Sequence, residues 1–139
     1  MGYHRILVPL DGSTLAELAL QHIPRLAAQG AQVHLVSAVV DTVGQMMALS
    51  QDLWPPSLSD ELAARETYMN QVAGSLREKG FDVTVEVRAG HPVDLIAKRS
   101  NSFDLIVMAT HGRTGLSRFL LGSISEGVLH EAACPVLIV

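Results

Sequence analysis

One stretch of the sequence combines the residue types that hold phosphate groups. It runs from Met108 to Ser123 and reads MATHGRTGLSRFLLGS. Its glycines allow main-chain amides to come close to a ligand, and Arg113 can add positive charge. If a helix begins at Gly122 and Ser123, the N–H groups up to Ile124 and the positive end of the helix dipole face the same ligand. The stretch therefore predicts an anion site between a strand and a helix.

Each part of this stretch also has a purely structural interpretation. Ser123 and Glu126 have the spacing of a capping box, so Ser123 can simply cap the helix. Gly112 can be an ordinary turn glycine, and Arg113 can be a solvated surface charge. A capping serine also sits where an anion would bind, so the two roles of Ser123 are compatible. The joint occurrence after a strand and before a helix favours phosphate.

A second candidate is Asp11, which follows the first apolar run of the chain. A carboxylate at the carboxyl end of a strand can accept hydrogen bonds from a base amino group or a ribose hydroxyl. The competing role is a cap for a helix that starts near Ser13. The sequence around Asp11 contains neither the Gly-x-Gly-x-x-Gly dinucleotide fingerprint nor a Gly-x4-Gly-Lys-Ser/Thr P-loop.

These residues must be positioned by a sheet and its helices. Apolar and β-branched runs predict five strands, at 6–10, 33–40, 81–89, 105–109 and 135–139. The third alternates apolar and polar residues, which favours a place near a sheet edge. Helical patterns fall between the strands, so the order β-α-β-α-β-α-β-α-β predicts a mostly parallel five-stranded sheet in a three-layer α/β/α fold.

Four helical segments are expected. The first carries an apolar stripe from Leu15 to Ala27, with a possible capping box at Thr14 and Glu17, a break at Pro24 and Gly30 after its end. The second spans about 59–79, the third follows Pro92, and the fourth begins at Gly122-Ser123 and directs apolar residues toward the core. The inward-facing residues expected on the fourth helix are Ile124, Val128, Leu129 and Ala132. The stretch 41–58 lacks such a pattern and predicts either a flap or a loop packed on its own domain.

Composition narrows the function classes. The chain has 139 residues, of which 48% are hydrophobic and 17% charged, with a net charge of −4. This composition predicts one folded domain over 1–139 and disfavours a nucleic-acid or acidic-membrane surface. No apolar run is long enough for a transmembrane helix, the first residues lack a signal-peptide layout, and Cys134 is the only cysteine. A cytoplasmic location is expected, with Cys134 as a small packed residue.

The sequence as a whole resembles the universal stress protein family. The resemblance rests on RILVPLDGS at 5–13, FDLIVM at 103–108, THGRTG at 110–115, the Gly122-Ser123 helix start and CPV at 134–136. It implies a Rossmann-like fold of the adenine nucleotide alpha hydrolase type that binds adenine nucleotides and forms homodimers. The ATP-binding branch carries Gly-x2-Gly-x9-Gly-Ser/Thr, and this chain matches it at Gly112, Gly122 and Ser123 but has Ala109 at the first position.

The resemblance implies roles for further residues. Pro9 and Asp11 would contact adenine, and main-chain groups at Ala38 or Val39 would meet the base. Met108 and Ala109 would lie near the ribose. The phosphates would be held by Gly112, Gly122, Ser123 and Ile124, with Arg113 adding charge and Mg²⁺ possible between phosphate oxygens. The sequence itself defines no metal site: its six histidines have no metal-ligand spacing, and no carboxylate cluster is evident.

Three functions remain open from the sequence. The first is an ATP-binding homodimeric stress-response module with an unknown protein partner. The second, supported by Ala109, is a dimeric interaction protein without nucleotide. The third is an enzyme, a slow ATPase or a phosphate-ester hydrolase. No evident general base is present to activate a water for attack on a γ-phosphate, so hydrolysis is expected to be slow. Dimerisation is expected through the apolar strand 135–139, which at a sheet edge would leave main-chain groups unpaired.

Overall fold

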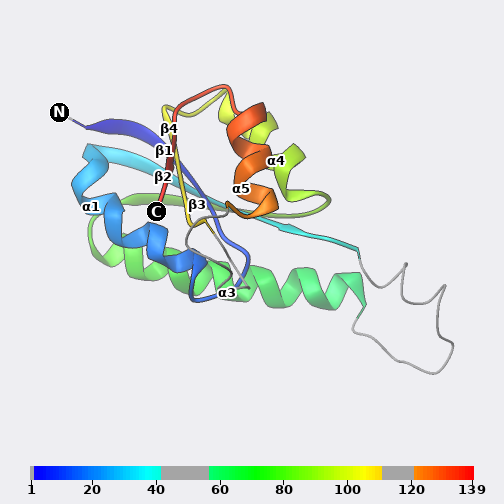
Figure 1. The fold of residues 1–139 in the computed structure, drawn as a ribbon. Helices are drawn as coiled ribbons and strands as arrows, with labels where there is room; N and C mark the ends of the chain where they lie inside the picture. Colours follow the sequence, from blue (N-terminus) through cyan, green and yellow to red (C-terminus); the bar gives the residue numbers. More distant parts are fainter. Residues whose placement is uncertain (1, 42–56, 111–120) are drawn as a thin grey trace, which may run out of the picture.

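The strands form one parallel sheet in the order β3-β2-β1-β4-β5 (Figure 1). The computed structural model describes residues 2–41, 57–110 and 121–139. The strands are β1 (Tyr3–Pro9), β2 (Ala27–Val39), β3 (Asp82–Ala89), β4 (Leu105–Met108) and β5 (Val136–Ile138). The helices are the 3₁₀ helix η1 (Ala16–His22) and the α-helices α1 (Ile23–Leu26), α3 (Leu58–Glu78), α4 (Pro92–Ser100) and α5 (Ser123–Glu131).

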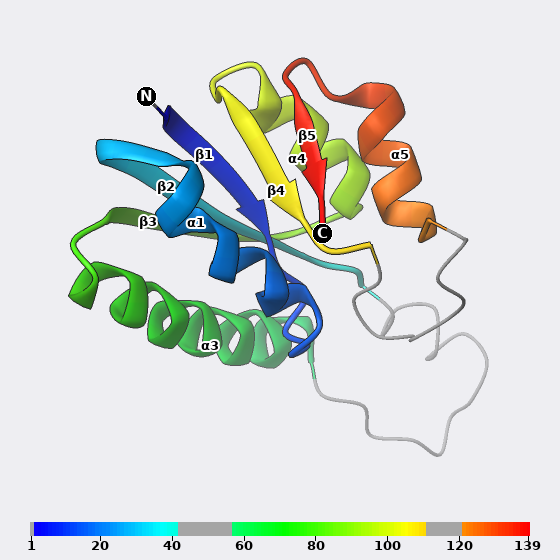
Figure 2. The same cartoon turned by 60° about the vertical axis from the view of Figure 1, so that its left-hand side comes forward.

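Helices cover both faces of this sheet, as Figure 2 shows. Because side chains alternate along a strand, consecutive residues of β1 belong to different cores. Ile6 and Val8 pack with η1, α1 and α3, whereas Leu7 packs with α4 and α5. All three side chains are fully buried, which explains why β1 is an uninterrupted apolar run. The predicted three-layer α/β/α fold is confirmed.

The most regular predicted elements are confirmed with small shifts at their ends. The helix expected over 59–79 is α3, whose N-cap Ser57 accepts a hydrogen bond from the Asp60 amide at 3.1 Å. Its inner face buries Met69, Val72, Ala73 and Leu76. The strand predicted near a sheet edge is β3, which lies at one edge, and β5 lies at the other.

The first helical segment differs from the prediction. Residues 16–22 form the 3₁₀ helix η1, α1 follows with Pro24 in its first turn, and Ala27 already belongs to β2. Ala27 pairs with Tyr3 of β1, and the register shifts before Arg5 pairs with Gln32. Tertiary pairing thus ends the helix earlier than the apolar spacing suggests, and Gly30, with a φ of +75°, lies within β2.

Two smaller predictions are also wrong. The capping box at Thr14 and Glu17 is not formed, because Ser13 Oγ accepts the hydrogen bond from the Ala16 amide at 3.2 Å. Leu129 was expected to face the core, but it is 43% exposed because the inner face of α5 is formed by Ser125 and Val128 instead.

Cys134 is partly buried and packs against the core beneath α4 and α5, and burial raises the pKa of its thiol.

Some predictions fall outside the described residues. A flap or a loop is expected at 41–58, and residues 42–56 of this stretch lie outside the described ranges. Among the described helices, none is long and apolar enough to cross a membrane.

Candidate functional site

A cavity of about 320 Å³ opens at the carboxyl ends of the strands, on the side of the sheet covered by α4 and α5. The chain leaves β1 toward one side of the sheet and β4 toward the other, so the strand order reverses between these neighbours. Such a reversal creates the crevice in which open α/β sheets bind ligands. The cavity is lined by Pro9, Leu10, Asp11, Ala16, Val36, Ala38, Pro92, Leu95, Ile96, Met108, Ala109, Thr110, Gly122, Ser123, Ile124 and Ser125.

Asp11 takes part in a local turn as well as lining the cavity. Its Oδ1 accepts hydrogen bonds from the Ser13 amide at 2.9 Å and from Ser13 Oγ at 2.5 Å. Ser13 Oγ in turn accepts from the Ala16 amide at the start of η1. Asp11 therefore has a structural role at the turn before η1, and this role uses only its Oδ1 oxygen. Both roles are compatible because Oδ2 has no hydrogen bond to any residue in the described ranges.

The end of β2 presents main-chain groups to the cavity at one residue. The Val36 carbonyl accepts from the Leu10 amide at 2.9 Å, so Val36 directs its main-chain groups toward β1. The direction alternates along a strand, and the Val39 carbonyl accordingly faces β3, where it accepts from the Gly90 amide at 3.0 Å. Ala38 has the same direction as Val36 but lies past the end of β1. Its N–H and C=O therefore face the cavity, and those of Val39 do not.

The first turn of α5 forms another wall of the cavity. Gly122 is the N-cap, makes no side-chain cap, and its carbonyl accepts from the Glu126 amide at 2.9 Å. Ser123 is the first helical residue, so the predicted capping box with Glu126 is not formed. The Gly122 amide donates to the Thr110 carbonyl at 3.2 Å. The donors left without a partner inside the helix are the amides of Ser123, Ile124 and Ser125.

The end of β4 carries the departure from the glycine pattern. No non-glycine residue in the described ranges has a positive φ, so Ala109 has ordinary main-chain angles. A residue with such angles accepts a methyl group without backbone strain. The Ala109 and Thr110 carbonyls both lie within hydrogen-bonding distance of Ser125 Oγ, at 3.1 and 2.9 Å.

The structure brings most of the predicted site residues together. Val39 borders a neighbouring hollow instead, and Gly112 and Arg113 lie outside the described residues. Sequence reasoning did not include the apolar wall from α4 or the buried Ser125. The Pro92 helix start indicated α4, but not which face of the sheet it covers. The predicted residues that line the cavity are Pro9, Asp11, Ala38, Met108, Ala109, Gly122, Ser123 and Ile124.

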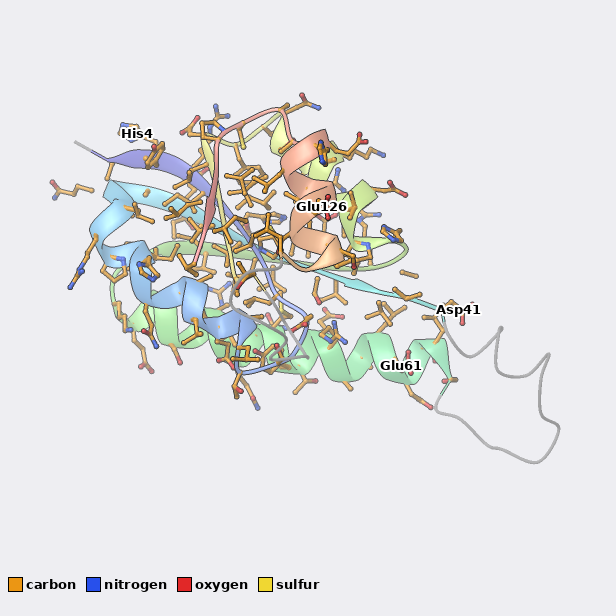
Figure 3. The ribbon with its side chains drawn as sticks, in the orientation of Figure 1. His4, Asp41, Glu61 and Glu126 are labelled. Carbon is orange, nitrogen blue, oxygen red and sulfur yellow. The ribbon has the colours of Figure 1, made fainter. Side chains whose placement is uncertain are left out.

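The neighbouring hollow has a volume of about 640 Å³ and shares Asp11, Ala38 and Pro92 with the cavity. Arg65 and Tyr68 of α3 line it, and Arg65 Nη1 donates to Ser37 Oγ at 2.7 Å. Burial, reinforced by the nearby Glu17 carboxylate, raises the pKa of Tyr68. Figure 3 shows Asp41 at the end of β2 and Glu61 near the start of α3, and Glu61 also lines this hollow.

The site offers little to a metal from protein side chains. Across residues 2–41, 57–110 and 121–139, no group of three or more His, Cys, Asp or Glu is arranged to hold a metal ion. Of the described residues that line the cavity, Asp11 alone carries a carboxylate.

Comparisons with known proteins agree with this architecture. Universal stress protein MJ0531 of Methanocaldococcus jannaschii is 34% identical over 99% of this chain and 82% of its own length. The solved structure of MJ0577, from the same organism, superimposes with a TM-score of 0.82 at 29% identity, covering 100% of this chain and 96% of that one.

Two more distant structures share the fold and are described with nucleotides. One is a universal stress protein in complex with cAMP, with a TM-score of 0.67, 21% identity and coverage of 100% and 98%. The other is an Arabidopsis thaliana universal stress protein family protein with AMP bound, with a TM-score of 0.63, 15% identity and coverage of 97% and 90%. The model of the universal stress protein family matches residues 2–139, and the chain belongs to this family.

Proposed function

We propose that this chain binds ATP in the cavity between β1 and β4 and acts as a homodimeric regulatory module of the stress response. The observation that carries the proposal is the joint position of three wall segments. The free main-chain groups of Ala38, the Asp11 carboxylate and the first amides of α5 all border one cavity of about 320 Å³. This volume lies at the lower end of the range for small-molecule sites.

The two ends of the cavity suit the two ends of a nucleotide. Ala38 offers one donor and one acceptor, which matches the hydrogen-bonding edge of a purine, and Asp11 Oδ2 can accept from the base or the ribose. The amides of Ser123, Ile124 and Ser125, together with the helix dipole, suit phosphate. Ala109 keeps ordinary main-chain angles, so its methyl group does not strain the backbone near the ribose.

The family relationship supports an adenine nucleotide as the ligand. Two proteins of this fold are described with cAMP and with AMP, which indicates that the fold accepts adenosine linked to phosphate in those proteins. For this chain we propose ATP, because Gly112, Gly122 and Ser123 keep the spacing of the ATP-binding branch. Mg²⁺ would bind through phosphate oxygens of the nucleotide.

We expect ATP hydrolysis to be slow at best. Within the described ranges, the only carboxylate that lines the cavity is Asp11, and a short turn to Ser13 occupies one of its oxygens. General-base catalysis requires a group within hydrogen-bond reach of the attacking water. The arrangement therefore favours a binding and signalling role over a dedicated enzyme.

Isothermal titration calorimetry with ATP tests the proposal. The wild-type protein should bind with a measurable heat at or below millimolar nucleotide, and Gly122→Trp should lose it. Gly122 has a φ of −63°, which every residue can adopt, and it lines the cavity, so the indole would occupy the ligand volume. Gly74→Trp is the matched control, because a Cβ atom at Gly74 meets no atom within 4 Å and the residue does not line the cavity.

The same titration distinguishes an ATP-binding protein from an interaction protein that binds no nucleotide. Folded wild-type protein that gives no heat and no thermal stabilisation with ATP would favour an interaction protein without nucleotide. Phosphate release from labelled ATP at equal rates by wild-type protein and Gly122→Trp would show that this cavity does not catalyse it.

A further inference from the structure

We propose that Ser125 is the positioning residue of the phosphate end of the site, an inference that rests on the proposed ATP binding. Ser125 is 2% exposed, so its hydroxyl lies beneath the first turn of α5 rather than in the cavity mouth. The hydroxyl has one proton and two acceptors within reach, the carbonyls of Ala109 at 3.1 Å and Thr110 at 2.9 Å. This is a three-centre hydrogen bond.

The two carbonyls within reach of Ser125 Oγ show how the main chain turns directly after β4. In an extended strand, consecutive carbonyls point to opposite sides, so one hydroxyl cannot reach both. Ala109 and Thr110 therefore lie at a bend, directly after the last strand residue Met108. Ser125 stabilises this bend at the edge of the cavity.

The Thr110 carbonyl also fixes the helix. It accepts from the Gly122 amide at 3.2 Å and from Ser125 Oγ, two donors three residues apart on the first turn of α5. Two attachments on one carbonyl set both the position and the tilt of that turn. The amides of Ser123 and Ile124 lie between them, so their direction toward a phosphate depends on these bonds.

Thr110 is itself held by the edge of the sheet. Its amide donates to the main-chain oxygen of Val139 at 3.1 Å, and the Val139 amide donates to Met108 at 2.9 Å. The first turn of α5 is thus connected through Thr110 to the hydrogen bonds between the ends of β4 and β5. Removal of the Ser125 hydroxyl leaves the turn attached to Thr110 through the Gly122 amide, and this hydrogen bond should then open more often as the turn shifts, without unfolding of α5.

The experiment compares Ser125→Ala with Ser100→Ala. Ser100 is a matched control because it is 1% exposed, its Oγ donates to Ala97 at 2.6 Å and accepts from the Ala133 amide at 2.9 Å, and it does not line the cavity. We expect Ser125→Ala to weaken ATP binding about two- to tenfold while adenosine binding stays unchanged. Ser100→Ala should lower thermal stability but leave both affinities unchanged, and Ser125→Thr, which keeps the hydroxyl, should restore ATP binding.

A second measurement works without any nucleotide. In the ligand-free protein, hydrogen exchange of the Gly122 amide should be faster in Ser125→Ala than in wild type or Ser100→Ala. Unchanged exchange at Gly122, or an equal loss of ATP and adenosine affinity, overturns the positioning role. Absence of ATP binding by the wild-type protein refutes the proposed function, and the exchange result still decides whether Ser125 fixes α5.

Discussion

At the residue scale, a cluster of charged side chains around Glu86 lies away from the cavity. The carboxylate of Glu86 on β3 accepts two hydrogen bonds from the guanidinium group of Arg99 on α4, at 2.8 and 2.6 Å. It accepts a third from Arg88 Nε at 2.5 Å. His34 Nε2 lies 3.1 Å from Glu86 Oε1, and its ring stacks on Phe103 at 5.5 Å between centroids. The Glu86 side chain is only 12% exposed, so this carboxylate depends on its partners.

Hydrogen bonding from Arg99, which outweighs the opposing effect of burial, holds the pKa of Glu86 well below its ordinary value near 4.5, with further contributions from Arg88 and His34. A carboxylate with a lowered pKa in the folded state stabilises that state above its unfolded pKa, and the contribution is lost as the pH falls. Glu86→Gln should therefore reduce the free energy of unfolding by about 1–3 kcal/mol at pH 7.

Urea unfolding at several pH values measures this effect. The difference between wild type and Glu86→Gln should be constant above about pH 5 and shrink as the pH falls below 4.5. Asp82→Asn, on the same strand but exposed, is the control and should change stability little. A difference that is independent of pH would contradict the assigned role of the charge.

At the element scale, the wall of the cavity depends on close packing of two helices. A Cβ atom at Gly127 of α5 would lie 2.8 Å from Cγ2 of Val93 on α4, shorter than real contacts allow. The absence of a side chain at Gly127 therefore permits the approach of α4 to α5, which together form the face of the cavity opposite β1 and β2. Helical periodicity marks Gly127 only as an unfavourable residue within a helix.

Gly127→Ala should lower the free energy of unfolding by about 1–3 kcal/mol, because the methyl group overpacks the contact between α4 and α5. Gly74→Ala in α3 is the matched substitution. It meets no atom within 4 Å and should raise stability by up to about 1 kcal/mol through helix propensity.

Chemical denaturation of both glycine variants measures the contrast. Adding Val93→Ala to Gly127→Ala should recover part of the loss, because it removes the atoms that the new methyl group meets. Stabilisation by Gly127→Ala would show that α4 and α5 are not in tight contact there.

At the scale of the whole molecule, β5 lies at one edge of the sheet and, among the described strands, pairs only with β4. Pro135 and Val139 direct main-chain groups toward β4, as their bonds to Ile106 and Met108 show. Because the direction alternates, Val136 and Ile138 direct theirs away from the sheet. The proposed homodimer would pair these groups with the same groups of a second copy.

Ile138→Pro should abolish this dimer. Proline removes the outward N–H of Ile138 without removing a bond to β4, and proline is tolerated on edge strands in that orientation. Ile138→Val keeps the amide and should remain dimeric. Sedimentation velocity at micromolar protein distinguishes the two, and a wild-type protein that sediments only as a monomer would refute the proposed interface.

The sequence predicted the layered fold and half of the residues that line the cavity. Continuous apolar strands, the break at Pro24 and the Gly122-Ser123 helix start are local signals, and the strand–helix order places the ends of the strands together. That is why Asp11, Ala109 and Ser123, far apart in the chain, were all expected at one crevice and all line it.

Which atoms of these residues face the cavity depends on the tertiary structure. Main-chain direction selects Ala38 over Val39, pairing of Ala27 with Tyr3 shortens the first helix, and burial gives Ser125 its two acceptors. The direction of a hydrogen bond and the burial of a side chain depend on residues from other segments of the chain. Residue type and spacing within one segment do not predict these tertiary contacts. The sequence thus located the crevice, and packing set its geometry.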